Sequence, residues 1–242
     1  MSSASCSQPD GRDSATIAVA TNFKTTLETL EADFETRSGY ELELVSGSTG
    51  KLYAQIINGA PYDVYLAADQ ARPERLVRDG RADSISRFTY AFGGIALWSS
   101  TLTDVSPDTL WDADFNRLAL ANPELAPYGQ ASVELIDHYE LTETLEPKLV
   151  FGESVGQAFA FVSTGNADLG FVSIAQVLAL PEEARGSAWL IPRQFYAPIA
   201  QDAVLLNHGK DNRAAQAFLT YLKSDAARQI IRRSGYWNDE LS

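Results

Sequence analysis

The stretch Ala15-Thr16-Ile17-Ala18-Val19-Ala20, with the residues that follow it, decides the fold class. This apolar run has the length and composition of a buried strand. The next apolar residues recur at intervals of four, three and four, which places them on one face of a helix: Phe23, Leu27, Leu30 and Phe34. Gly39 then supplies the residue type that commonly ends a helix. A buried strand that leads into an amphipathic helix is typical of an α/β protein.

The same alternation continues to about residue 77. Strand-like runs at 41–45 and 64–68 are each followed by helical spacing, at 52–57 and 73–77. Strand–helix–strand succession joins parallel neighbours, and the connecting helices cover the sheet. Residues 15–77 therefore predict a parallel sheet with helices on both faces.

The rhythm changes after Arg87. Residues 88–99 form one apolar stretch longer than most strands, and such a strand can cross between domains. A second α/β unit follows, with strands at 118–120, 149–151 and 169–172, and helices at 132–145 and 155–162. Strand-like runs at 188–191 and 203–206 precede a C-terminal helical region at 215–231.

We therefore predict an α/β protein with two doubly wound α/β lobes and a ligand cleft between them. Residues 15–90 plus 196–242 form lobe 1, residues 91–195 form lobe 2, and residues 1–14 are a flexible leader. Crossings near 88–98 and 192–198 form the hinge.

Composition and motifs exclude several functions. Nineteen Lys and Arg stand against 32 Asp and Glu, so the formal net charge is −13 and no nucleic-acid partner is expected. One cysteine and two histidines, His138 and His208, leave little for a metal cluster or a proton relay, and we expect both histidines on the solvated surface. The Gly-x-Ser-x-Gly elbow is absent, and Gly47–Lys51 lacks the Walker spacing. We expect a monomer without a cofactor, and no enzyme.

Cys6 leaves two interpretations open. Ala4-Ser5-Cys6-Ser7 is similar to the junction at which bacterial lipoproteins are cleaved and acylated, although Ser3 stands where an aliphatic residue is usual. Cys6 is therefore either a lipid anchor or an incidental thiol in a disordered tail.

Hydrogen-bond donors gather at four strand-to-helix junctions, at 20–23, 46–50, 122–129 and 153–156. The first holds Thr21 and Asn22, and the second adds the hydroxyls of Ser48 and Thr49. Ligands of open parallel sheets bind where the strands end, and free amides at helix starts attract anions. We expect these junctions to share one cleft and to hold a divalent oxyanion without Lys or Arg. The alternative is that each is a plain cap, which stabilises its helix by ~1 kcal/mol.

The residues at these junctions resemble the periplasmic molybdate-binding proteins of ABC importers. The likeness runs in order from Ala15 to Tyr236. It is carried by these strings: Ala20-Thr21-Asn22-Phe23, Ser46-Gly47-Ser48-Thr49-Gly50, Gly59-Ala60-Pro61-Tyr62-Asp63-Val64, Ala67-Ala68-Asp69, Asn122-Pro123 with Ala126-Pro127-Tyr128-Gly129, Ser154-Val155-Gly156-Gln157 and Ala167-Asp168-Leu169-Gly170-Phe171-Val172.

The resemblance implies a type II periplasmic-binding fold that closes over one tetrahedral oxyanion, molybdate or tungstate, held through its oxygens with no direct metal coordination. It also implies a periplasmic or extracytoplasmic location and a membrane permease of an ABC importer as the partner. The implied ligand contacts are Thr21, Asn22, Ser48, Thr49, Tyr128 and the backbone of Val155. Many family members have a tyrosine where this chain has Ser173, so the role of Ser173 stays open.

The expected chemistry is binding without reaction. A fully deprotonated oxyanion offers only acceptors, so a pocket of neutral donors satisfies it and rejects a protonated phosphate. Two alternatives stay open: a binding protein for another small oxyanion, such as sulfate or phosphate, and an enzyme on the same scaffold.

Overall fold

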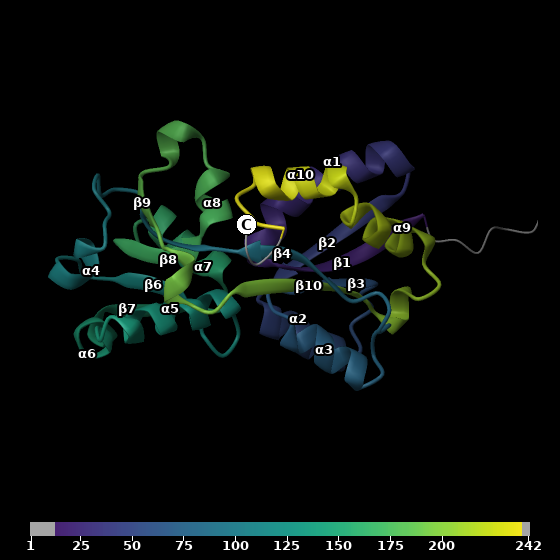
Figure 1. The fold of residues 1–242 in the computed structure, drawn as a ribbon, viewed down its shortest axis with the longest axis horizontal. Coiled ribbons are helices and arrows are strands. Elements are labelled where there is room, and N and C mark those ends of the chain that lie inside the picture. The colour runs from purple at the N-terminus through teal and green to yellow at the C-terminus, as the bar shows by residue number, and fades with distance from the viewer. Residues whose placement is uncertain (1–12, 239–242) are drawn as a thin grey trace, which may run out of the picture.

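Two five-stranded sheets, each covered by helices on both faces, form the two lobes of the computed structural model, which describes residues 13–238 (Figure 1). The sheet of the first lobe has the order β2-β1-β3-β10-β4. Its strands are β1 (Ser14–Ala20), β2 (Glu41–Gly47), β3 (Val64–Leu66), β4 (Phe88–Gly93) and β10 (Ile199–Leu205). The fold class predicted from the sequence is confirmed.

The sheet of the second lobe has the order β7-β6-β8-β5-β9. Its strands are β5 (Ile95–Ser99), β6 (Leu118–Ala121), β7 (Leu149–Gly152), β8 (Leu169–Ser173) and β9 (Ser187–Leu190). The predicted crossing stretch at 88–99 is thus two strands, β4 and β5, which belong to different sheets and are separated by Gly94.

Helices sandwich each sheet (Figure 1). In the first lobe, α1 (Lys24–Ser38), α9 (Arg213–Leu222) and α10 (Asp225–Arg233) cover one face, and α2 (Thr49–Ile57) and α3 (Ala71–Arg78) cover the other. The second lobe contains α4 (Asp108–Asp112), α5 (Pro127–His138), α6 (Thr142–Leu145), α7 (Val155–Ser163) and α8 (Ile174–Leu178). Phe23, Leu27, Leu30 and Phe34 are all buried in the core beneath α1, as their spacing predicts. Gly39 ends α1 in the left-handed conformation, with φ 75°.

Parallel pairing places the predicted junctions at shared sheet edges. In the first lobe β1 runs parallel to β2, and Ala20 lies opposite Gly47. In the second lobe β6 runs parallel to β7, and Ala121 lies opposite Gly152. The two junctions of each lobe therefore emerge side by side from neighbouring strands.

Neither sheet is wholly parallel. β10 pairs antiparallel with both β3 and β4, and β5 pairs antiparallel with both β8 and β9. One crossing between the lobes joins β4 to β5 and the other joins β9 to β10, and neither contains the α-helix that a parallel connection requires.

Two helix predictions are corrected. The single helix expected at 132–145 is two helices, because the chain turns at Glu140, whose φ of 57° no α-helix continues. The first of them begins earlier, at Pro127, since a proline at the first helical position lacks only an N–H that has no partner there. The C-terminal helical region is also divided, with Ser224 capping α10.

Other expectations concern the ends of the chain. β1 begins at Ser14, so that residue belongs to the first strand rather than to a leader. Cys6 and most of the predicted leader lie outside the described residues. No helix within residues 13–238 is long and apolar enough to cross a membrane.

Candidate oxyanion site between the lobes

The four predicted junctions lie together where the lobes meet. The amide of Gly156, at the fourth junction, donates to the Thr21 hydroxyl at the first over 3.2 Å. The amide of Gly50, at the second, donates to the carbonyl of Leu125 at the third over 2.8 Å. Asn22 Nδ2 lies 3.3 Å from the hydroxyl oxygen of Tyr128. Each of these contacts joins a residue of one lobe to a residue of the other, so the structure is closed around the junctions.

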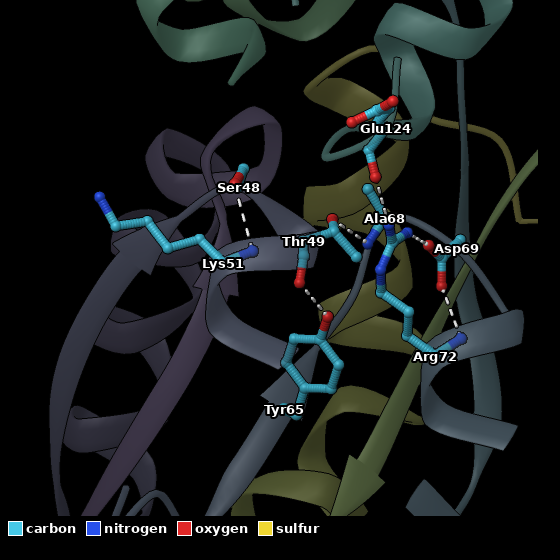
Figure 2. Close-up of polar contacts among 8 residues, drawn as sticks. All are labelled: Ser48, Thr49, Lys51, Tyr65, Ala68, Asp69, Arg72 and Glu124. Atoms are coloured by element: carbon cyan, nitrogen blue, oxygen red, sulfur yellow. Dashed lines mark hydrogen bonds and ion pairs between the residues drawn. The ribbon is translucent and has the colours of Figure 1, made fainter. Parts of the chain in front are cut away.

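Three small hydroxyls share one arrangement. Thr21 accepts from the amide of Gly156, Ser48 accepts from the amide of Lys51 over 3.3 Å, and Thr49 accepts from the amide of Ala68 over 3.2 Å. Figure 2 shows the last two contacts at the start of α2. A hydroxyl that accepts an N–H bond keeps its own proton for donation. All three are therefore able to donate to a ligand that offers only acceptors.

The backbone N–H of Thr49 is a second hydrogen-bond donor at the start of α2. This amide is the first of α2 and has no partner within the helix, and Val155 holds the same position in α7. Ser48 and Ser154 cap the amides further along, those of Lys51 and Gln157. Both serines therefore cap their helices, and the first amide of each helix is left for a ligand.

Tyr128 is a buried, neutral donor. Its side chain is 2 % exposed, and burial raises the pKa of its hydroxyl well above the ordinary value of 10.0. The hydroxyl therefore keeps its proton at neutral pH. It lies next to Asn22, which is also buried and whose carboxamide donates 2.8 Å to Gln201 Oε1 and 3.2 Å to the Tyr236 hydroxyl.

The charged groups at the rim are paired with one another. Lys51 Nζ on the first lobe lies 3.0 Å from Glu153 Oε2 on the second. Arg72 pairs with Asp69 on its own lobe and donates 2.9 Å to the carbonyl of Glu124 across the cleft (Figure 2). The cations nearest the junctions therefore hold the lobes together at the rim.

A cavity of about 210 Å³ lies beside the junctions, between Ala68 on one lobe and Pro127 on the other. Its lining residues include the acidic Asp69 and Glu134. None of the ligand donors described above belongs to this lining; they lie at the helix starts next to the cavity. The oxyanion position that the donors favour is therefore at the junctions.

Three residues of this region are absent from the sequence prediction: Tyr90, Gln201 and Tyr236. All three are buried: Gln201 and Tyr236 are hydrogen-bonded to Asn22, Gln201 is also bonded to Tyr128, and Tyr90 is bonded to Gln201. One signal is available for Gln201, since it forms with Asp202 a polar pair inside the otherwise apolar strand β10. Ser173, whose role stayed open, is fully buried and caps α8 by accepting from the amide of Ala175 over 3.2 Å.

The prediction that both histidines lie on the surface is confirmed, since His138 and His208 are both exposed. His138 is exposed and packs against Tyr139 and Phe195. His208 is also exposed, and its Nδ1 lies 2.8 Å from the buried carboxylate of Asp63. No group of three or more His, Cys, Asp or Glu side chains able to hold a metal ion occurs in the part of the chain that the structure describes.

Comparison with known proteins gives the family. Residues 15–237 match the family model described as bacterial extracellular solute-binding protein. The molybdate-binding protein ModA of Azotobacter vinelandii is 45% identical over 222 residues, which are 91% of this chain and 88% of that protein. ModA of Rhodobacter capsulatus is 42% identical over 220 residues, 90% of this chain and 86% of that protein.

A solved structure agrees with these relatives. The structure described as Azotobacter vinelandii periplasmic molybdate-binding protein superposes with a TM-score of 0.89 at 38% identity, and the match covers 93% of this chain and 100% of that one. The resemblance seen in the junction strings is confirmed. The chain therefore belongs to the bacterial extracellular solute-binding proteins, in the same family as these two molybdate-binding relatives.

Proposed function

We propose that this chain captures molybdate, or tungstate, between its lobes outside the cytoplasm and delivers it to the permease of an ABC importer. The observation that carries the proposal is the shared state of four hydroxyls from both lobes: Thr21, Ser48, Thr49 and Tyr128. Each accepts an N–H bond from the protein and so keeps its proton for donation. The names of the relatives at 45% and 42% identity support the choice of ion.

The energetics favour a fully deprotonated ion. A hydrogen bond to a charged group contributes roughly 1.5–3 kcal/mol, so several neutral donors suffice without a cationic side chain. Hydrogen phosphate carries an O–H that needs an acceptor, and a cluster of donors leaves that O–H unpaired. The metal atom is held only through its oxygens in this proposal, and no cofactor takes part.

Closure follows from the placement of the donors. Thr21, Ser48 and Thr49 belong to the first lobe, whereas Tyr128 and Val155 belong to the second. An ion that bonds to both sets binds the closed state better than the open one and shifts the population toward it. We propose that the permease distinguishes the loaded protein by this closed state, and that the chain acts as a monomer without catalysis.

Sulfate is the alternative ion that the chemistry allows. It has the same charge and shape as molybdate and also offers only acceptors, but it is smaller. Donors spaced for the longer metal–oxygen bonds cannot all reach it at once, so we expect weaker binding.

Thermal unfolding in a panel of molybdate, tungstate, sulfate, phosphate and chromate tests the proposal. An ion present at about a thousand times its Kd stabilises the folded state by ~4 kcal/mol. We expect molybdate and tungstate to raise the melting temperature at micromolar concentration and phosphate to leave it unchanged. The proposal is wrong if neither molybdate nor tungstate stabilises the protein, and the sulfate alternative gains if sulfate alone does.

A further inference from the structure

Two buried side chains that are not proposed ligand contacts, those of Gln201 and Tyr236, are hydrogen-bonded to the Asn22 and Tyr128 side chains. Gln201 lies on β10 and Tyr236 follows α10 near the end of the described chain. Their exposed fractions are 0% and 3%. Buried polar groups of this kind form hydrogen bonds in defined directions, because each hydroxyl has a single proton to donate.

The direction of donation in this hydrogen-bond network is fixed by the backbone carbonyl of Asn22. The Tyr236 hydroxyl lies 2.7 Å from the carbonyl oxygen of Asn22, which can only accept, so Tyr236 donates its proton there. The oxygen of Tyr236 then accepts from Asn22 Nδ2, 3.2 Å away. This pair of bonds fixes the Asn22 carboxamide with its NH₂ group turned into the network.

The orientation of the Asn22 carboxamide in turn fixes the orientation of the Gln201 side-chain amide. The Asn22 NH₂ group lies 2.8 Å from Gln201 Oε1, and the Tyr90 hydroxyl lies 3.1 Å from the same oxygen. With Oε1 held as the acceptor, the Nε2 group of Gln201 faces the Tyr128 hydroxyl at 3.4 Å. Tyr128 thus receives an N–H group from Gln201, whereas the two protons of the Asn22 NH₂ group, 3.3 Å away, already serve Gln201 Oε1 and Tyr236.

Because the hydroxyl oxygen of Tyr128 accepts the N–H group of Gln201, its own proton is left to be donated elsewhere. An anionic oxygen is a stronger acceptor than a neutral hydroxyl, because hydrogen bonds to charged groups are roughly twice as strong. We propose that Gln201 is a positioning residue which, oriented by Tyr236 through Asn22, commits Tyr128 to donate to the oxyanion. The inference rests on the proposed function, and it makes the selection of fully deprotonated anions a property of Gln201 as well as of the ligand contacts.

Gly93 provides the space for this arrangement. It ends β4, and a Cβ atom at this position would overlap the hydroxyl of Tyr128 and lie 2.7 Å from Gln201 Nε2. Tyr128 comes from the second lobe, whereas Gln201, Asn22 and Tyr236 belong to the first. The glycine thus lets the hydroxyl of one lobe reach the amides of the other.

A double-mutant cycle tests the role of Gln201. Gln201→Met keeps the size of the side chain and removes both amide functions. We expect it to weaken molybdate binding, measured by titration calorimetry, about tenfold in the wild-type background and less than about twofold when Tyr128→Phe is already present. Gln70→Met is the matched control, because Gln70 also lies on the first lobe but bonds to Thr89 and Asp202 instead. We expect the control to leave the affinity unchanged.

The outcomes separate the inference from the proposed function. If the wild-type protein does not bind molybdate, the proposed function fails. If it binds molybdate and Gln201→Met costs the same factor in both backgrounds, Gln201 acts only on the structure and the inference is overturned. Should Gln201→Met not fold, Tyr236→Phe takes its place, since it removes one hydroxyl from the same relay and the same coupling to Tyr128→Phe is expected.

Discussion

The double substitution Thr49→Val with Tyr128→Phe is expected to weaken molybdate binding about a thousandfold, from two lost charge-assisted hydrogen bonds at roughly 1.5–3 kcal/mol each. Both changes nearly preserve shape and delete one hydroxyl from each lobe. The two residues are 1% and 2% exposed, so water cannot easily replace the missing donors. Titration calorimetry with molybdate measures the loss.

The fold should tolerate the same double substitution. Thr49→Val removes the acceptor of the Ala68 amide and Tyr128→Phe removes the acceptor of Gln201 Nε2, at about 1–3 kcal/mol of stability each. The double variant Thr36→Val with Tyr139→Phe deletes the same atoms from each lobe outside the cleft and should bind normally. A loss below tenfold in the test variant would mean that these hydroxyls do not contact the ion.

Gly156→Val is expected to weaken molybdate binding on the order of a hundredfold by preventing closure, since two packed surfaces that overlap by a side chain cannot meet. A Cβ atom at Gly156 would already lie 3.0 Å from Cβ of Thr21 on the other lobe. The two methyl groups of valine extend further and would also displace the bond from the Gly156 amide to Thr21 Oγ1. Affinity by calorimetry and closure by small-angle scattering are the two measurements.

Ser163→Val is the matched control for this variant. It places the same side chain on the exposed end of the same helix, α7. We expect it to bind molybdate and close normally. A Gly156→Val protein that contracts on adding molybdate as the wild type does would show that the contact with Thr21 does not limit closure.

The secondary-structure elements are predictable from the sequence because buried apolar residues recur at the period of a helix or a strand. The interval pattern from Phe23 to Phe34 predicts α1, and each of its four apolar residues is buried. The four junctions are also predictable, since parallel strands end at a common edge and small polar residues gather where helices begin. Their meeting between the lobes follows from the order of strands and helices alone.

The residues that support the site, Gln201 and Tyr236, are not marked by any such spacing in the sequence. Gln201 and Tyr236 lie 179 and 214 residues after Asn22, to which both are bonded. Their role depends on the antiparallel insertion of β10 between β3 and β4 and on the path of the chain after α10. Neither role shows in local periodicity, because the spacing of neighbouring residues does not reveal which distant side chain a polar residue faces.

The points at which helices begin and end were also not predictable from the apolar spacing. The apolar spacing at 132–145 is continuous enough for one helix, but the chain turns at Glu140 between α5 and α6. In the sequence, Ser173 stands out only because many members of the family that the chain resembles have a tyrosine there. In the structure, Ser173 caps α8. In both cases a backbone conformation decides the structure, and residue type alone does not determine that conformation.

The most direct test of a neutral-donor site is a crystal structure of the protein with molybdate, in which anomalous scattering locates the metal atom. We predict one molybdenum atom between the two lobes, with its oxygens bonded to the hydroxyls of Thr21, Ser48, Thr49 and Tyr128 and to the amide of Val155. We also predict that no Lys or Arg side chain touches the ion. A molybdenum atom elsewhere, or one held by a cationic side chain, would contradict the account.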